Sequence, residues 1–183
     1  MPIQTLKYAS TVSSTVQNVS RIEENDDSKA LADATGESFI VELTNLTGNI
    51  ASINSVQYKV GANCTAGAAV AIFTIEILDG SNSQYFSEFE AIGVGTSEET
   101  ETGTVRTTDG SSAWTESTVN AIRLKGTFTA QSATTDLEID YVHLLVDYEE
   151  PEPNAGLIKL NSGLVKLNSG LVKINSGLVK IIA

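Results

Sequence analysis

The side chains that could carry out catalysis are few in this sequence. His143 is the only histidine and Cys64 the only cysteine. His143 lies within an apolar run typical of a core strand, so we expect a buried, hydrogen-bonded imidazole rather than the base of a Ser-His-Asp triad. Cys64 has no basic neighbour that would lower the pKa of its thiol, and one cysteine with one histidine does not make a zinc site. We therefore expect no catalytic residue, no cofactor and no enzymatic activity.

Acidic side chains gather at two places. Asp136, Glu138 and Asp140 alternate along a predicted strand and so share one face, while residues 23–27 hold four acids in a predicted loop. Carboxylate oxygens are ligands that Ca²⁺ prefers, but neither group has the spacing of a known calcium-binding loop. We interpret both groups as solvent-exposed and predict no metal-binding residue, although bound Ca²⁺ stays an open question.

Three large aromatic residues, Tyr58, Tyr85 and Trp114, could stack against a sugar ring. Aromatic residues make up only 6% of the chain, and large rings are used mainly to fill cores. We expect these three in the core. A surface that binds a glycan remains an alternative.

The elements that would position these residues are short strands. Runs rich in β-branched and aromatic residues, broken by turn residues, predict strands at 38–43, 53–60, 70–78, 84–90, 102–108, 121–129 and 137–148. The apolar phase of 137–148 changes partway, which predicts a β-bulge near residues 141–143. Only residues 21–35 could hold a helical turn, or equally a loop. The pattern predicts an all-β protein with an antiparallel β-sandwich.

The chain is predicted to have four parts. Residues 1–37 are expected to form an N-terminal arm and loop, and residues 38–148 the sandwich. Residues 149–155 are a linker, because Pro151 and Pro153 deny a sheet its donors and favour an extended spacer. Residues 156–183 form a repeat tail.

Charge is divided unevenly between these parts. Residues 1–150 hold seven basic and 22 acidic side chains, a net charge of −15, whereas residues 151–183 hold four lysines and one acid, a net charge of +3. Nucleic-acid binding requires clustered Lys and Arg, so we exclude it for this acidic body. The apolar runs are too short to span a membrane. The N-terminus lacks a signal-peptide pattern, which predicts synthesis without secretion.

The tail consists of four near-identical seven-residue units, beginning at Gly156, Gly163, Gly170 and Gly177. Each of the first three units holds strand-forming residues followed by Asn-Ser-Gly, a turn sequence that excludes a helix, and the fourth unit is truncated. The result is a heptad-repeat β-ribbon with one apolar face that needs burial. The units could form hairpins with Asn-Ser-Gly as a three-residue loop, or the sides of a triangular coil wound from three chains.

Isolated four-residue strands bury too little to be stable alone, so the ribbon is expected to pair with another surface. We predict that its apolar residues serve in assembly or attachment. They are Leu157, Ile158, Leu160, Leu164, Val165, Leu167, Leu171, Val172, Ile174, Leu178, Val179 and Ile181.

A Thr-, Ser- and Gly-rich sandwich that closes with the strand 139–148 and continues into short strand-turn repeats resembles virion proteins of tailed bacteriophages. These families include head-decoration proteins, head fibres and tail-associated fibres, which are often trimeric with jelly-roll-like folds. The resemblance covers the layout and assigns no role to any residue. It implies a homotrimeric structural component of a virion, made in the host cytoplasm, whose repeat binds its own copies or other virion proteins. The alternative is a carbohydrate-binding or adhesin module on an oligomeric stalk.

Overall fold

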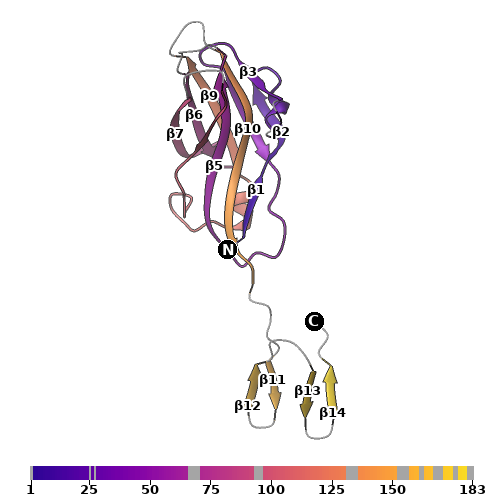
Figure 1. Ribbon diagram of the computed structural model, residues 1–183. Helices are drawn as coiled ribbons and strands as arrows, with labels where there is room; N and C mark the ends of the chain where they lie inside the picture. Colours follow the sequence, from indigo (N-terminus) through magenta and orange to yellow (C-terminus); the bar gives the residue numbers. More distant parts are fainter. Residues whose placement is uncertain are drawn as a thin grey trace. The chain divides into compact units, whose positions relative to one another are not determined.

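The chain forms two compact units, residues 1–149 and 150–183. The computed structural model describes residues 2–24, 26, 28–65, 71–92, 97–130, 136–151, 157–160, 163–166, 171–174 and 177–180. In the first unit, two antiparallel sheets face each other as a jelly-roll-like β-sandwich (Figure 1). This confirms the fold class predicted from the sequence.

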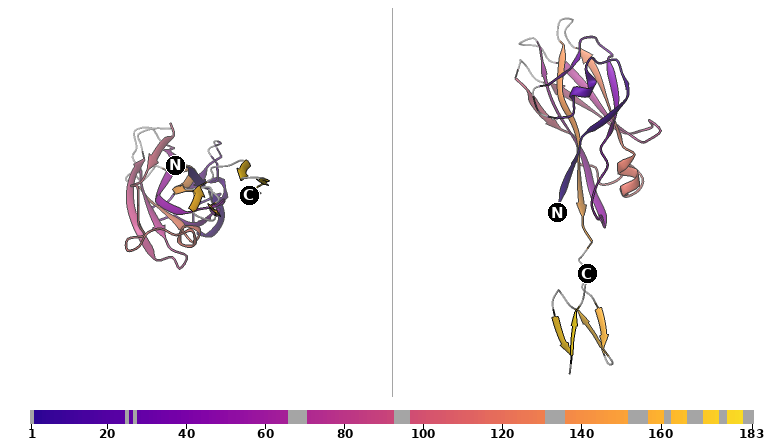
Figure 2. Two further views of the ribbon diagram at one scale, coloured as in Figure 1. Left: turned by 90° about the horizontal axis from the view of Figure 1, so that it is seen from below. Right: turned by 90° about the vertical axis from the view of Figure 1, so that its right-hand side faces the viewer.

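Each sheet of the sandwich has five strands, all paired antiparallel. One sheet has the order β1-β10-β5-β8, with β3 also paired to β10; these strands are β1 (Ile3–Leu6), β10 (Leu137–Glu149), β5 (Ser52–Cys64), β8 (Glu99–Thr102) and β3 (Ala30–Ala32). The other has the order β2-β4-β9-β6-β7, made of β2 (Tyr8–Ser14), β4 (Ser38–Leu43), β9 (Arg123–Ala130), β6 (Ala71–Leu78) and β7 (Gln84–Ile92). A 3-10 helix η1 (Val19–Arg21) and a short helix α1 (Glu116–Asn120) lie outside both sheets (Figure 2).

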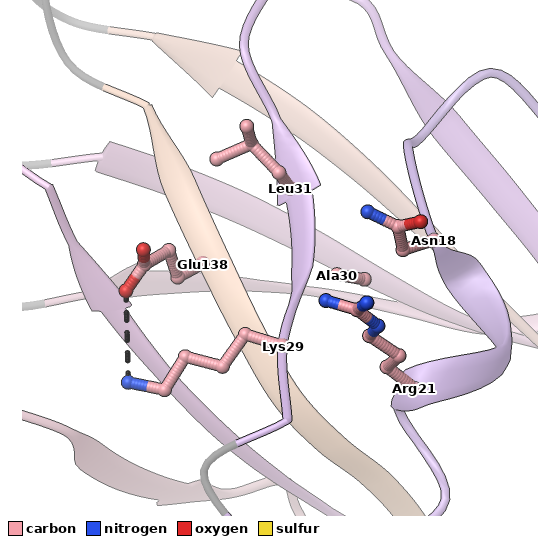
Figure 3. Close-up of a pocket in the computed structure, with 6 residues that line it drawn as sticks. All are labelled: Asn18, Arg21, Lys29, Ala30, Leu31 and Glu138. Atoms are coloured by element: carbon pink, nitrogen blue, oxygen red, sulfur yellow. Dashed lines mark ion pairs between the residues drawn. The ribbon is translucent and has the colours of Figure 1, made fainter.

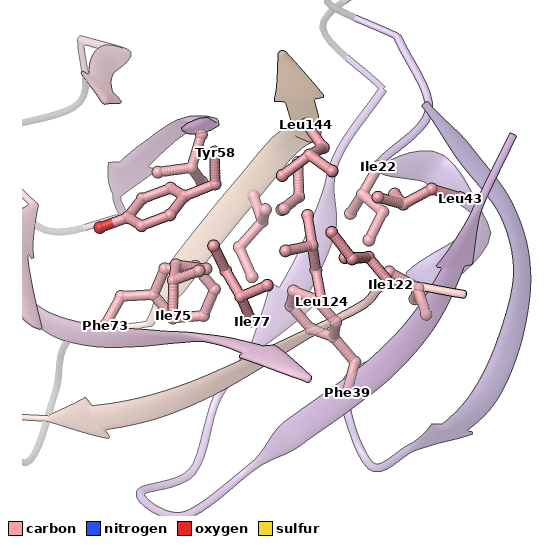
Figure 4. Close-up of a cluster of buried hydrophobic side chains, with 14 of the residues drawn as sticks. Ile22, Phe39, Leu43, Tyr58, Phe73, Ile75, Ile77, Ile122, Leu124 and Leu144 are labelled. Carbon is pink, nitrogen blue, oxygen red and sulfur yellow. The ribbon is translucent and has the colours of Figure 1, made fainter. Parts of the chain in front are cut away.

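The core lies between the two sheets. Burial alternates along β4 and β6, as expected where one face of a strand is covered and the other is not. Figure 4 shows Phe39 and Leu124 of one sheet near Tyr58 and Leu144 of the other. Gly126 of β9 leaves space for the rings, since a Cβ there would lie 2.4 Å from Phe73 Cζ.

The predicted β-bulge in the last sandwich strand is present, at a slightly earlier position. The register of β10 against β5 shifts between Ile139 and Tyr141, so that Asp140 is the extra residue. The shift lets Ile139 and Val142 both enter the core. Tyr141 lies directly opposite Gly61, where a Cβ would approach its ring to 2.3 Å.

The structure differs from the prediction for residues 1–37, which were expected to form an arm and loop. They contribute β1 and β2, one to each sheet, and β3 pairs with the first part of β10. β2 is rich in Ser and Thr and largely exposed, so it lacks the apolar alternation that reveals a half-buried strand. For residues 21–35, where a helical turn or a loop was expected, the chain has η1 ending at Arg21 and β3 within the range.

Two further elements differ from the sequence predictions. The weak strand expected at 102–108 is β8 at Glu99–Thr102, followed by isolated bridges between Arg106 and Val56 and between Thr108 and Ala113. Helix α1 was not predicted; Thr115 caps it by accepting a hydrogen bond from the Thr118 N–H at 3.1 Å. Five residues are too few to show helical periodicity.

The second unit contains two antiparallel hairpins. β11 (Leu157–Leu160) pairs with β12 (Gly163–Lys166), and β13 (Leu171–Ile174) pairs with β14 (Gly177–Lys180). The two registers are equivalent, because Ile158 opposes Val165 and Val172 opposes Val179. Of the two geometries open from the sequence, the described strands adopt hairpins.

The repeating unit of the tail is therefore a 14-residue pair of heptads. Gly163 and Gly177 are register partners of Leu160 and Ile174, so they belong to the strands and not to the loops expected from Asn-Ser-Gly. Among the described tail strands, the pairings are confined to each hairpin.

Candidate functional site

A polar hollow of about 410 Å³ lies on the sandwich beside η1 and β3 (Figure 3). Its lining residues are Asn18, Arg21, Lys29, Ala30, Leu31 and Glu138. A backbone bridge between Gln17 and Leu31 holds the start of η1 against β3, with N···O distances of 2.9 and 3.0 Å. The other edge of β3 pairs with β10, which supplies Glu138. The hollow thus rests on backbone pairing on both sides.

One wall of the hollow is a closed network of three polar side chains. The Lys29 Nζ donates to Asn63 Oδ1 at 2.6 Å and lies 3.6 Å from Glu138 Oε2. The Asn63 Nδ2 donates to the same Glu138 oxygen at 2.9 Å. Asn63 is only 3% exposed, so both ends of its amide are satisfied where water has little access.

The opposite wall carries Arg21, at the end of η1. The following residue, Ile22, is fully buried in the core, and its carbonyl accepts a hydrogen bond from Val142 N–H. The Arg21 side chain is exposed and extends from η1 toward β3 (Figure 3). Among the described residues, no side-chain hydrogen bond or ion pair joins its guanidinium.

The sequence did not single out this hollow. Lys29 and Glu138 are 109 positions apart, and pairing of β3 with β10 had not been predicted because β3 has only three residues. A visible signal was the scarcity of cations in the acidic body. In this body, Arg21 is an exposed cation whose neighbour Ile22 is anchored in the core, so the backbone at Arg21 is fixed.

The predicted assembly residues lie in the four tail strands where the structure describes them. Their positions are Leu157, Ile158 and Leu160 in β11, Leu164 and Val165 in β12, Leu171, Val172 and Ile174 in β13, and Leu178 and Val179 in β14. Leu167 and Ile181 fall outside the described residues.

His143 is a buried imidazole, as predicted. It is 9% exposed, its Nε2 lies 2.9 Å from the Glu23 carbonyl oxygen, and its ring stacks on Tyr141 with centroids 4.8 Å apart. Burial lowers the pKa of His143 more than its hydrogen bond raises it. The ring is therefore held neutral near pH 7 and stabilises the outer face of the sheet.

Cys64 ends β5 and is fully buried. Burial is also the main reason that the pKa of its thiol is raised. A buried thiol with a raised pKa is a poor nucleophile.

Of the aromatic residues considered for sugar stacking, Trp114 and Tyr58 lie in the core as predicted, whereas Tyr85 is half-buried and packs against it. Trp114 is 4% and Tyr58 1% exposed. Tyr85 packs edge-on against Trp114, with ring centroids 5.6 Å apart, and the Trp114 Nε1 donates to the Arg106 carbonyl at 2.9 Å. Trp114 and Tyr58 are therefore buried away from any ligand, whereas Tyr85 is half-buried at the edge of the core.

A half-buried carboxylate closes the edge of the sandwich near these rings. Glu88 of β7 accepts hydrogen bonds from the Tyr58 hydroxyl at 3.1 Å and the Thr104 N–H at 2.8 Å, and it pairs with Arg106. Burial raises the pKa of Glu88, but hydrogen bonds from Thr104, Arg106 and Tyr58 together outweigh it, so the pKa lies below its ordinary value. Glu88 thus joins β7 to the segment after β8.

The two acidic groups do not converge. Glu138 is engaged by Lys29 and Asn63, whereas the bulge buries Asp140, contrary to the exposure expected for it. Neither oxygen of Asp140 has a hydrogen-bond partner among the described residues. Glu23, Glu24 and Asp26 are exposed. Within the described part of the chain, no three His, Cys, Asp or Glu side chains are grouped as metal ligands.

No family model matches the sequence, and no curated protein matches it at a significant level. The sandwich is similar to several solved structures. The CBM36-1 domain of a multidomain xylanase from the hindgut metagenome of Trinervitermes trinervoides is 12% identical with a TM-score of 0.47, covering 81% of this chain and 98% of that chain.

Viral proteins are also among the similar structures. The enzymatically active domain of tailspike protein 4 of bacteriophage CBA120 is 14% identical with a TM-score of 0.41, covering 78% of this chain and 19% of that chain. A chain of infectious bursal disease virus, Gt strain, is 13% identical with a TM-score of 0.41, covering 80% of this chain and 33% of that one. At this level of similarity none of them assigns a ligand, an activity or a partner.

Neither helix in the described part of the chain has the length and apolar character needed to cross a membrane.

Proposed function

We propose that this protein is a non-enzymatic structural component of a viral particle, a capsid-decoration or tail-associated protein whose C-terminal repeat mediates self-association or attachment. The virion part of the proposal rests on the layout described from the sequence. The role of the repeat rests on one structural observation, namely that β11 with β12 and β13 with β14 form two short hairpins with equivalent registers.

Two-stranded hairpins of this size are too small to be stable by themselves. A single hairpin is at best marginally stable in water, and three or more strands or a packed face are needed for independent stability. Each tail hairpin has strands of only four residues. Strand edges without partners are templates for pairing with another chain. The tail therefore fits a role in which a second molecule completes it.

The charge of the tail favours the same role. Its four described strands carry Lys159, Lys166, Lys173 and Lys180, and the sandwich unit carries a large negative charge. Opposite charges speed encounter and fix orientation between partners. A second copy of the chain supplies both complementary charge and an equivalent pair of hairpins, which supports self-association. The trimer is the stoichiometry that the resemblance to virion proteins implies.

The experiment compares the solution mass of the full chain with that of a chain ending at Glu149. We expect the full chain to be trimeric and the shortened chain monomeric, with equal thermal unfolding midpoints for the sandwich. If the shortened chain forms an assembly with the same number of copies as the full chain, the assembly role of the tail is overturned. A monomeric full chain that binds particles only when residues 150–183 are present would support attachment instead of self-association.

A further inference from the structure

The hollow beside η1 contains the one cation of the sandwich that has no partner among the described residues. Five of the seven basic side chains form ion pairs with Glu24, Glu42, Glu76, Glu88 or Glu138. A sixth, Lys59, lies 5.4 Å from the ring centroid of Tyr141. Arg21 is the seventh, and it borders a concavity. In an acidic unit where the other cations are engaged, this makes Arg21 a candidate for binding a ligand.

The chemistry of Arg21 points to an oxyanion. A guanidinium is planar and always charged, and it presents paired N–H donors that match a carboxylate in a bidentate arrangement. The buried Ile22 anchors the backbone next to it, and the Gln17–Leu31 bridge fixes η1 against β3. The backbone that carries Arg21 is therefore fixed in advance, so only the side-chain torsions of Arg21 remain to be ordered on binding.

The other lining residues restrict the anion to a small charge. Glu138 places a carboxylate in the same hollow, and although Lys29 and Asn63 engage it, its side chain is still 35% exposed. A phosphate dianion would meet this carboxylate and the negative field of the whole unit. A single carboxylate would lose less, because it brings half the charge to Arg21.

The volume and polarity of the hollow suggest what carries that carboxylate. About 410 Å³ lies within the range of small-molecule sites. Asn18, Lys29 and Glu138 offer donors and acceptors, and no aromatic side chain lines the hollow. Amide, ammonium and carboxylate groups of this kind hydrogen-bond to hydroxyl groups. We propose that the hollow binds a sugar acid, with its carboxylate on Arg21 and its hydroxyls toward Asn18 and Glu138.

This site is independent of the assembly role of the tail, because all of its residues lie between positions 18 and 138. It also differs from stacking on Trp114, whose ring is buried. The full-length protein is therefore suitable for the test, and a failure of assembly would not affect the result.

The test measures binding of glucuronate and galacturonate to the full-length protein by NMR titration and calorimetry. Glucose, acetate and inorganic phosphate serve as comparison ligands. We expect millimolar binding of a uronate, with chemical-shift changes at residues 18–31 and 138, and at least several-fold weaker binding of the three comparison ligands.

The key variant is Arg21→Gln, with Lys7→Gln as the matched control, because Lys7 has the same charge and does not line the hollow. Loss of a charge-assisted bidentate contact should weaken uronate binding about tenfold or more in Arg21→Gln and leave it unchanged in Lys7→Gln. Arg21→Lys should give an intermediate loss. Equal thermal unfolding midpoints would show that the variants are folded.

Several results would overturn the proposal. These are no uronate binding at millimolar concentrations, equal losses in Arg21→Gln and Lys7→Gln, or binding that Arg21→Gln leaves intact. Equal affinity for acetate would show that the sugar hydroxyls do not contribute to binding. Tighter binding of phosphate would show that the hollow does not select a singly charged anion.

Discussion

The sandwich and the tail are both built from antiparallel strands, yet they differ in how completely those strands are used. β5 and β10 have 13 residues each and lie in the interior of a sheet. The tail strands have four residues and one partner each among the described residues. The first unit therefore contains its own core, while for the second we propose stabilisation by another surface. Stability and assembly are thus expected to separate experimentally.

The largest effect should come from overfilling the sandwich core. Gly126→Ala places a Cβ 2.4 Å from Phe73 and 2.5 Å from Phe39, so two buried rings must move. We expect the free energy of unfolding to fall by about 1–3 kcal/mol, measured by denaturant unfolding, with the oligomeric state unchanged.

Gly80→Ala is the matched control for this substitution. A Cβ at Gly80 would lie 3.5 Å from Ala121, which is an ordinary contact, so a change within about 0.5 kcal/mol is expected. If both variants lost stability equally, the close packing around Gly126 would not be the cause.

A smaller effect should come from the Glu88 carboxylate. Glu88→Gln removes the negative charge that pairs with Arg106 and accepts the hydrogen bond from the Thr104 N–H. We therefore expect the free energy of unfolding to fall by roughly 1–2 kcal/mol at pH 7. Because the folded pKa of Glu88 lies below its ordinary value of 4.5, this stabilisation is present above that value and is lost as the pH falls through the folded pKa. The stability difference between the variant and the natural protein should therefore shrink in acid.

The control for this pH dependence is Glu116→Gln, an exposed carboxylate on α1. The free energy of unfolding of Glu116→Gln should stay within about 0.5 kcal/mol of the natural value. A difference for Glu88→Gln that stayed constant from pH 7 to pH 3 would contradict a role for its ionisation.

The smallest effect on sandwich stability should come from shortening the tail, where the number of heptads decides the outcome. Deleting residues 163–176 leaves two heptads that can form one hairpin with the observed register. Deleting residues 170–176 leaves three heptads, one of which has no intrachain partner, and such an edge promotes aggregation.

Both deletions should leave the unfolding free energy within about 0.5 kcal/mol of the natural value. Light scattering should show more aggregation for the three-heptad chain than for either the two-heptad chain or the full-length chain with four heptads. If aggregation fell steadily from four heptads to three to two, the hairpin would not be the structural unit of the tail.

The sandwich strands that could be predicted are those with one face covered by the core, because this coverage produces a regular apolar pattern in the sequence. The alternation in β4 and β9 and the apolar phase change in β10 identified these strands and the bulge. In contrast, β2 is exposed and polar, and β3 has three residues, so each depends on its partner strand for its conformation. Local sequence carries little information about such pairings.

The hollow could not be predicted for the same reason. Its residues come from η1, β3 and β10, and only the pairing of β3 with β10 brings Lys29 near Glu138. The Asn-Ser-Gly repeat shows a related limit. The sequence identified it as a turn but could not tell which residue ends the loop, since Gly fits both the loop and the strand end that Gly163 and Gly177 occupy.

The position of β10 also affects how the chain folds as it is synthesised. β10 pairs with β1, β3 and β5, and Ile3 meets Asp147 across 144 positions. Contacts this distant form slowly, and the sheet cannot close until the whole of β10 has left the ribosome. The tail hairpins join strands only a few residues apart, and such hairpins form in about 1–10 μs. The tail is therefore able to pair before the sandwich that precedes it in the chain has finished folding.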